Sequence, residues 1–191
     1  MTRTGIFGGS FNPIHNAHLH LGRLFLEAAG LDELWFLVSP QNPLKQNKDL
    51  LDEQLRLQMV EMALEGDERM KACDFEFSLP RPSFMIHTLT EMSSRWPDRE
   101  FALLIGGDNW QRFGLWFRAD EIIDSYDLYI YPRKDAAIDE GMLPPTVHLL
   151  EAELDNMSST EIRRRISRGE SIDGLVPDAV RLFIEQEGLY R

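Results

Sequence analysis

Strand-like and helix-like segments alternate along the whole chain, and this alternation limits the fold more than any other feature of the sequence. The runs at 34–38 and 101–105 are continuously apolar, as expected for strands that are buried on both faces of a sheet. Parallel strands joined by helices produce this pattern. We therefore expect an α/β fold, built as a doubly wound parallel sheet with helices on both faces and a C-terminal helical portion.

The expected elements cover most of the chain. Strands are predicted at residues 4–7, 34–38, 70–77, 101–105, 127–131 and 147–150. Helices are predicted at 19–29, 51–64, 119–124, 159–167 and 177–187, and another is predicted from an N-cap at Ser83 to about Pro97. We expect Pro177 at a first helical position. A chain of 191 residues is long enough to bury a single large core, so residues 1–191 are expected to form one domain.

The first predicted strand is followed by a glycine pair and then by two histidines. Gly8 and Gly9 let backbone amides approach a ligand closely, and His15 and His18 lie near a helix start, with Asn16 as one candidate N-cap. A helix N-terminus attracts anions, and imidazoles can donate hydrogen bonds to phosphate oxygens. This segment indicates a phosphate site. The alternatives are that the glycines form a tight turn and that one histidine caps or packs.

Three further segments with glycine or cationic residues each follow a predicted strand. These are Lys45 in the loop 41–48, Gly106 to Asp108, and Arg133. Ligands of open parallel sheets bind beyond the carboxyl ends of the strands, near the point where the strand order reverses. We therefore expect these segments to meet the glycine pair at one edge of the sheet.

A second dense segment, residues 158–165, reads Ser-Ser-Thr-Glu-Ile-Arg-Arg-Arg. Ser158 and Glu161 fit a helix capping box, and an arginine run on a helix is commonly a solvated face. Hydroxyls and amides at a helix start also bind phosphate, and Arg163 lies one turn further on. Both interpretations can hold together. Arg163 is expected to contact ligand, whereas Arg164 and Arg165 are expected at the surface.

Aromatic and acidic side chains follow the strand at 101–105. Asp108 could accept hydrogen bonds from a ribose or a ring amine, and the indole of Trp110 or Trp116 could stack on a flat heterocycle. The alternative for each tryptophan is a place in the core. His20, His87 and His148 lack such neighbours and are expected to be structural.

The charge and cysteine content exclude several classes of protein. A net charge of −12 argues against non-specific binding to nucleic acid or to an anionic membrane, because that binding needs Lys and Arg. The single Cys73 cannot form an intramolecular disulfide and is expected as a small buried thiol. The first residues show no apolar run typical of a signal peptide or membrane span, so a cytoplasmic protein is expected. The sequence leaves oligomeric state open, including a homo-oligomer.

Two segments resemble known motifs. Residues 8–18 read Gly-Gly-Ser-Phe-Asn-Pro-Ile-His-Asn-Ala-His, which is similar to the Gly-Gly-Thr-Phe-Asp-Pro-x-His-x-Gly-His segment of the nucleotidyltransferase superfamily of adenylyl and cytidylyl transferases. Residues 158–163 resemble that superfamily's late Ser-Ser-Thr-x-x-Arg motif. The whole chain resembles the family of bacterial nicotinate mononucleotide adenylyltransferases, because Lys45, the segment 106–116 and Arg133 fall where that family keeps its binding elements.

The resemblance implies a Rossmann-like fold and a reaction of NAD biosynthesis. AMP would pass from ATP to the 5′-phosphate of nicotinate mononucleotide by direct attack with no covalent intermediate, giving nicotinate adenine dinucleotide and pyrophosphate. Such a reaction requires alignment and charge neutralisation rather than a protein nucleophile. The small-molecule substrates would be ATP and nicotinate mononucleotide. Mg²⁺ would be bound mainly through substrate phosphates, with no protein residue as a metal ligand.

The resemblance also implies roles for individual residues. The catalytic residues would be His15, His18, Lys45 and Arg163. The ATP-binding residues would be Gly8, Gly9, Ser10, Phe11, Gly106, Asp108, Ser158, Ser159 and Thr160. The mononucleotide would be bound by Met85, Trp116 and Arg133, with the nicotinate ring stacked on Trp116.

The sequence departs from the family pattern at a few positions. Ala17 replaces the glycine between the histidines, and Asn12 replaces an aspartate. Met85 stands where the family commonly has threonine, near the expected pyridine carboxylate, and the Lys45 loop lacks the histidine that often precedes its lysine. These departures concern the choice between acid and amide substrates.

Three other functions are considered. A pantetheine-phosphate adenylyltransferase usually has threonine where this chain has His15 and lacks an equivalent of the segment 106–116. A non-catalytic nucleotide sensor would keep the pocket, and Asn12 and Ala17 are the departures that point to it. The presence of His15, His18, Lys45 and Arg163 argues against it. A nucleic-acid-binding domain built on the arginine run is disfavoured by the net charge of −12.

Overall fold

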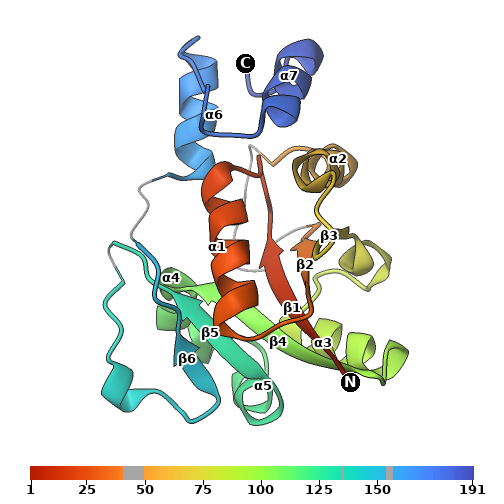
Figure 1. Ribbon diagram of the computed structural model, residues 1–191, viewed down its shortest axis with the longest axis vertical. Coiled ribbons are helices and arrows are strands. Elements are labelled where there is room, and N and C mark those ends of the chain that lie inside the picture. The colour runs from red at the N-terminus through yellow and green to blue at the C-terminus, as the bar shows by residue number, and fades with distance from the viewer. Residues whose placement is uncertain (41–49, 135, 154–156) are drawn as a thin grey trace.

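Six strands form one parallel sheet in the computed structural model, in the order β3-β2-β1-β4-β5-β6 (Figure 1). The structure describes residues 1–40, 50–134, 136–153 and 157–191. The strands are β1 (Thr2–Gly9), β2 (Glu33–Val38), β3 (Met70–Cys73), β4 (Arg99–Gly106), β5 (Asp127–Tyr131) and β6 (Val147–Leu149). The predicted α/β fold with a parallel sheet is confirmed.

The sheet is doubly wound about β1. From β1 the chain first builds β2 and β3 on one side, and it then crosses back to place β4, β5 and β6 on the other. Ile6 shows the central place of β1, since it pairs with Trp35 of β2 and with Leu103 of β4 and is fully buried. The strand order reverses between β1 and β4, which is where open α/β sheets bind ligands.

Successive side chains of β1 enter different cores on the two faces of the sheet. Phe7 packs in a core with residues of α1 (Asn16–Ala28) and α2 (Glu53–Leu64). Ile6 packs in a second core with residues of α3 (Met85–Arg95) and α5 (Ala119–Ser125). This alternation follows from the strand period of two, and it gives the sheet helices on both faces. A short helix, α4 (Gly107–Gln111), follows β4 directly.

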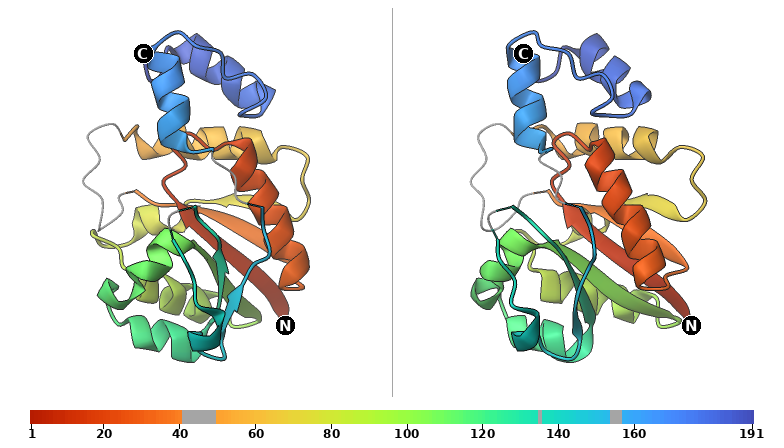
Figure 2. Two further views of the ribbon diagram at one scale, coloured as in Figure 1. Left: turned by 90° about the vertical axis from the view of Figure 1, so that its left-hand side faces the viewer. Right: turned by 60° about the vertical axis from the view of Figure 1, so that its left-hand side comes forward.

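Two helices complete the chain beyond the carboxyl ends of the strands, α6 (Ser159–Ser167) and α7 (Asp178–Glu187). Figures 1 and 2 both show these two helices together above the sheet, at the end toward which strands β1 and β2 point. The turn before α7 is joined to the start of α1, because the Asn16 side-chain amide donates a hydrogen bond to the Gly174 carbonyl at 2.8 Å. The predicted C-terminal helical portion is confirmed.

The strand predicted at 70–77 is wrong in its second half. β3 ends at Cys73, and the next residues form a 3-10 helix, η1 (Phe75–Ser78). The alternation around Phe75 and Phe77 is typical of a strand with Glu76 on its solvent face. In the structure Glu76 is 3 % exposed and hydrogen-bonds to two other segments, and this buried contact replaces the extended conformation.

Several predicted helix starts are also shifted, and α1 begins at Asn16 rather than at residue 19 and α2 at Glu53 rather than at residue 51. α3 begins at Met85 with Phe84 as its N-cap, so the prediction of Ser83 as a cap is wrong. His15, not Asn16, is the N-cap of α1. Pro177 is the N-cap of α7 and stands one place before its first helical residue. Helix ends are decided by which local groups bind the free backbone N–H groups, and residue preferences alone do not specify these contacts.

Two further expectations are a buried thiol at Cys73 and the absence of a membrane span. Cys73 is partly buried, and burial raises the pKa of its thiol to about 11, so it stays protonated at neutral pH. Within the described parts of the chain, no helix combines the length and the apolar character needed to cross a membrane.

A pair of leucine substitutions tests the core. Leu34 in β2 is fully buried, whereas Leu182 in α7 is 46 % exposed. We expect Leu34→Ala to lower the free energy of unfolding by about 2–5 kcal/mol, because it leaves a cavity. The matched Leu182→Ala, which removes the same atoms, should change it by less than about 0.5 kcal/mol. Urea unfolding followed by circular dichroism measures both, and equal losses would contradict the burial assigned to Leu34.

Candidate active site

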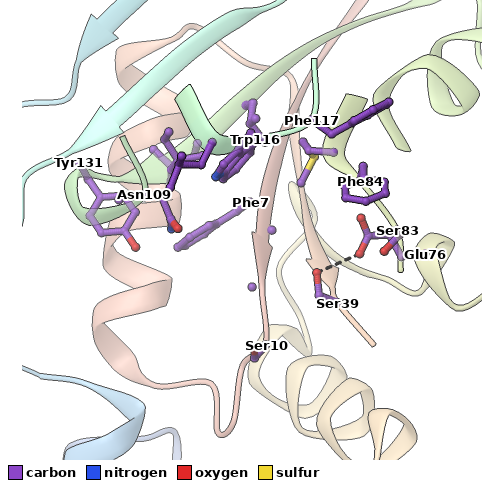
Figure 3. Close-up of a pocket in the computed structure, with 18 residues that line it drawn as sticks. Phe7, Ser10, Ser39, Glu76, Ser83, Phe84, Asn109, Trp116, Phe117 and Tyr131 are labelled. Atoms are coloured by element: carbon purple, nitrogen blue, oxygen red, sulfur yellow. Dashed lines mark hydrogen bonds between the residues drawn. The ribbon is translucent and has the colours of Figure 1, made fainter. Parts of the chain in front are cut away.

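A pocket opens at the carboxyl ends of β1 and β4, where the strand order reverses (Figure 3). Its walls are largely aromatic and aliphatic, with a few polar groups and glycines between them. Ligand sites commonly have this composition. The lining residues are Phe7, Gly8, Gly9, Ser10, Ser39, Glu76, Ser83, Phe84, Met85, Leu103, Leu104, Ile105, Gly106, Asn109, Leu115, Trp116, Phe117 and Tyr131.

Two glycines give this pocket its space. A Cβ atom at Gly8 would lie 3.3 Å from Cε of Met85, on the pocket wall. A Cβ atom at Gly106 would lie 2.6 Å from Oδ1 of Asp108 and 3.0 Å from the Tyr131 side chain. These glycines are the ends of strands β1 and β4, rather than residues after them. A side chain at Gly106 would therefore displace Asp108 or Tyr131, and one at Gly8 would press on the end of the Met85 side chain.

One end of the pocket carries a buried carboxylate. Glu76 accepts a hydrogen bond from Ser39 Oγ at 2.9 Å and another from Thr88 Oγ1 at 2.7 Å. Figure 3 shows the contact with Ser39, beside Ser83 and Phe84. Glu76 thereby joins the end of β2 to η1 and α3. A buried carboxylate needs such donors, because burying a charge without partners is costly.

The two histidines lie against each other at the start of α1. Their ring centroids are 3.6 Å apart with an angle of 24° between the planes, and the His15 backbone N–H donates to Nδ1 of His18 at 3.2 Å. An Nδ1 atom that accepts a hydrogen bond carries no proton, so the neutral His18 ring has its proton on Nε2. His18 also packs edge-on against Phe7 and Phe11.

Burial lowers the pKa of His18 well below its ordinary value, and the nearby His15 and Arg133 lower it further. At neutral pH the ring is therefore neutral. Because its acceptor nitrogen is engaged by the His15 N–H, the ring presents Nε2–H as its donor.

The start of α6 is joined to the loop after β1. The Arg163 guanidinium donates from Nη1 to the Asn12 carbonyl at 2.9 Å, and Ser159 Oγ donates to the Pro13 carbonyl at 2.9 Å. Arg163 Nη2 also lies 3.4 Å from Thr160 Oγ1. Two motif segments that are about 150 residues apart in sequence thus share one site.

Ser158 has the capping role that one interpretation gave it. It is the N-cap of α6, and its Oγ accepts a hydrogen bond from the Glu161 backbone N–H at 3.1 Å. The Glu161 carboxylate pairs instead with Arg164 and Arg165, which lower its pKa to about 2. These two arginines are thus used in ion pairs within α6.

Arg133 closes another side of the site. Its Nη2 donates to the hydroxyl oxygen of Tyr131 at 3.2 Å, and its Nε lies 3.8 Å from Oδ1 of the exposed Asp108. Its charge also contributes to the lowered pKa of His18, so the cation lies near the histidine pair. Arg133, Asp108 and Gly106 therefore meet at the carboxyl edge of β4 and β5.

Apart from Arg133 and Asp108, most of the predicted site residues fall into two groups. One group lines the pocket, namely Gly8, Gly9, Ser10, Met85, Gly106 and Trp116. The other surrounds the starts of α1 and α6, namely His15, His18, Ser158, Ser159, Thr160 and Arg163. Phe11 is only 2 % exposed and packs against Phe7 and Phe36, so its side chain belongs to the core. Lys45 lies outside the described residues.

Two buried charged residues at this site were not found from the sequence. Glu76 is hidden by the strand-like alternation around it. Arg56 carries a detectable signal, because Arg56, Met59 and Val60 share the i, i+3, i+4 spacing of a buried helical face. An arginine in an apolar stripe is rarely buried unless its guanidinium is bound by other groups.

The described residues offer no protein cage for a metal. Among 1–40, 50–134, 136–153 and 157–191, no three His, Cys, Asp or Glu side chains are grouped closely enough to bind one. The polar groups near the histidine pair are mostly nitrogen and hydroxyl donors, which match phosphate oxygens.

Comparison with known proteins identifies relatives over nearly the whole chain. Residues 6–165 match the family model described as cytidylyltransferase-like. A protein of Bacteroides fragilis named "Probable nicotinate-nucleotide adenylyltransferase" is 46% identical over 97% of this chain and 92% of its own length. A protein of Flavobacterium johnsoniae with the same name is 37% identical over 99% of each chain.

A solved structure shares the fold at lower sequence identity. Nicotinic acid mononucleotide adenylyltransferase of Plasmodium falciparum, complexed with NaAD, superposes with a TM-score of 0.84 at 19% identity. The match covers 100% of this chain and 98% of the other. This similarity supports the arrangement of the sheet and of the C-terminal helices.

The lowered pKa of His18 predicts how the ring titrates. The midpoint of its ¹³Cε1–¹H signals in NMR should fall below the ordinary value of about 6.5. As pH falls, His18 is protonated in the unfolded chain at a higher pH than in the folded chain. His18 should therefore lower the free energy of unfolding as pH falls below about 6.5. His18→Ala assigns the signal by its absence, and a midpoint at or above 6.5 would contradict the desolvated ring.

Proposed function

The chain belongs to the cytidylyltransferase-like family and to the nicotinate-nucleotide adenylyltransferases within it, and we propose that it transfers AMP from ATP to nicotinate mononucleotide. It is a nucleotidyltransferase of NAD biosynthesis. The proposed products are nicotinate adenine dinucleotide and pyrophosphate.

The joining of the histidine segment to the start of α6 carries this proposal. Arg163 and Ser159 both reach the carbonyls of the loop after β1, next to a pocket with aromatic walls. A phosphate-binding helix start beside an aromatic pocket suits a substrate that has both a phosphate and a flat ring. Such a pair of subsites fits two nucleotides that must meet at their phosphates.

We assign the substrates to the two groups of residues. The ATP phosphates are proposed to lie over the ends of β1, α1 and α6, with Arg163 and the histidines around them. The pyridine ring is proposed to lie in the pocket against Trp116, close to Met85. Arg133 is proposed to bind the phosphate of the mononucleotide, because its charge acts on His18 and its guanidinium lies 3.8 Å from Asp108, just after β4.

The proposed chemistry needs no protein nucleophile. An oxygen of the mononucleotide phosphate attacks the α-phosphorus of ATP, and the new P–O bond forms as the bond to the β-phosphate breaks. Pyrophosphate leaves with the bonding electrons. Neutral His18 can donate Nε2–H to an oxygen whose negative charge increases in the transition state, and the His15 N–H holds the ring in that orientation.

Mg²⁺, when bound through the substrate phosphates and water, would neutralise part of their charge. In this proposal no residue of the chain binds it directly. The cationic side chains, with Lys45 proposed among them, then supply the remaining neutralisation and fix the phosphates for in-line transfer.

A substrate comparison tests the proposal. With ATP and Mg²⁺, we expect pyrophosphate release with nicotinate mononucleotide to be clearly faster than release with nicotinamide mononucleotide or phosphopantetheine. A coupled pyrophosphate assay measures all three under one set of conditions. Equal rates with the acid and the amide would contradict the choice of substrate, and no turnover with any of them would favour a nucleotide sensor.

Substitution of His18 tests the proposed donor. His18→Ala should lower kcat by about a hundredfold, as expected for loss of one transition-state hydrogen bond. The matched control is His20→Ala, an exposed histidine of the same helix, which should leave kcat unchanged. Circular dichroism checks that both variants fold. Wild-type turnover by a folded His18→Ala protein would exclude the role.

A further inference from the structure

Arg56 of α2 is the largest fully buried side chain among the residues that the structure describes, with 1 % of its surface exposed. A guanidinium keeps its charge at neutral pH, so full burial is costly unless other groups solvate it. Burial does lower the pKa of Arg56, but an arginine begins far above neutrality and remains charged. A permanent positive charge therefore lies inside the protein.

Backbone carbonyl oxygens bind this guanidinium. Nη1 donates to the carbonyls of Ser10 and Ser39, each at 2.7 Å, and Nη2 donates to the Pro40 carbonyl at 3.1 Å. Nε donates to the Leu51 carbonyl at 2.9 Å. One side chain thus fixes the loop after β1, the end of β2 and the approach to α2. The planar fork of arginine can hold several acceptors at once, which a lysine cannot do with the same geometry.

Within the described ranges, no carboxylate forms an ion pair with Arg56. The two carboxylates nearest to Arg56 in sequence have other partners. Asp52 caps α2 by accepting from the Gln54 N–H, and Glu53 pairs with Arg81 at 2.5 Å. These carboxylates act on Arg56 only at longer range. The positive charge is compensated mainly by carbonyl dipoles.

The contacts of Arg56 determine the spacing of two pocket walls. Ser10 and Ser39 both line the pocket, and they follow different strands. Their carbonyl oxygens carry partial negative charge, which would repel a phosphate if they turned toward it. Arg56 binds these oxygens from the α2 side. Small displacements of groups that align two reactants are enough to lower a rate strongly.

We propose that Arg56 is a positioning residue for adenylyl transfer, whose guanidinium fixes the loop after β1 relative to the end of β2 and so aligns the two substrates. This inference rests on the proposed function above. Arg56 does not touch the substrates. It acts through the carbonyls of Ser10, Ser39 and Pro40 and through the positive charge that it keeps beside the phosphate site.

The test compares Arg56→Lys and Arg56→Met with a matched control, Arg69→Lys. Arg69 also donates to backbone carbonyls, those of Leu31 and Asp32, but it does so before β2, at the other end of the sheet. Each protein is assayed for kcat and KM with ATP and nicotinate mononucleotide well below its melting temperature. Hydrogen exchange of the Ser39 N–H, which donates to the Gly9 carbonyl at 2.9 Å, reports the alignment without turnover.

Arg56→Met should lower kcat/KM by about a hundredfold, mainly through kcat. Arg56→Lys keeps the charge but not the fork, and it should lower kcat/KM by about tenfold. In both variants the Ser39 N–H should exchange at least about tenfold faster, while the Leu128 N–H in β5 should not change. Arg69→Lys should leave kcat/KM within about twofold of the wild type.

The inference is overturned if folded Arg56→Lys and Arg56→Met proteins keep wild-type kcat/KM, or if exchange at Ser39 is unchanged. If Arg56→Met does not fold, the kcat/KM of Arg56→Lys and the exchange rate of its Ser39 N–H test the inference. A wild-type protein that is inactive with nicotinate mononucleotide would refute the proposed function instead. Exchange at Ser39 would then still show whether Arg56 fixes the two segments.

Discussion

The loop after β1 is held through its carbonyl oxygens, and the rest of the candidate site depends on this constraint. The carbonyls of Ser10, Asn12 and Pro13 accept hydrogen bonds from side chains of α2 and α6. Buried carbonyls require partners, and here side chains supply them where no strand or helix can. The loop is therefore rigid although it is not regular. It also ties the sheet to both helices.

The fold could be predicted well from the sequence because its main signals are local. Continuous apolar runs such as 34–38 gave the buried strands, and helical spacing between them gave the covering helices. The errors arose where tertiary contacts replaced a local preference. Glu76 turned a strand-like alternation into η1 because its carboxylate binds Ser39 and Thr88, and this contact has no signature in the sequence.

The location of the candidate site was predictable because the order and direction of the strands determine it. Residues at the carboxyl ends of parallel strands lie on one edge of the sheet, and the structure brings Gly8, Gly106 and Arg133 together there. The directions in which individual side chains point were not predictable. The sequence does not indicate that the Phe11 ring enters the core, or that a buried Arg56 organises two loops, because both depend on the packing of distant elements.

The hydrogen bonds that the loop after β1 accepts from α6 and from the residues after α7 have a consequence for the order of events during synthesis. Asn12 accepts from Arg163, 151 residues later, and from the hydroxyl of Tyr190, 178 residues later. Contacts of such long sequence separation form late, because the intervening chain must first be made and brought together. On the ribosome, β1 and α1 emerge first, yet their connecting loop acquires these partners only after α6 and α7 have been translated.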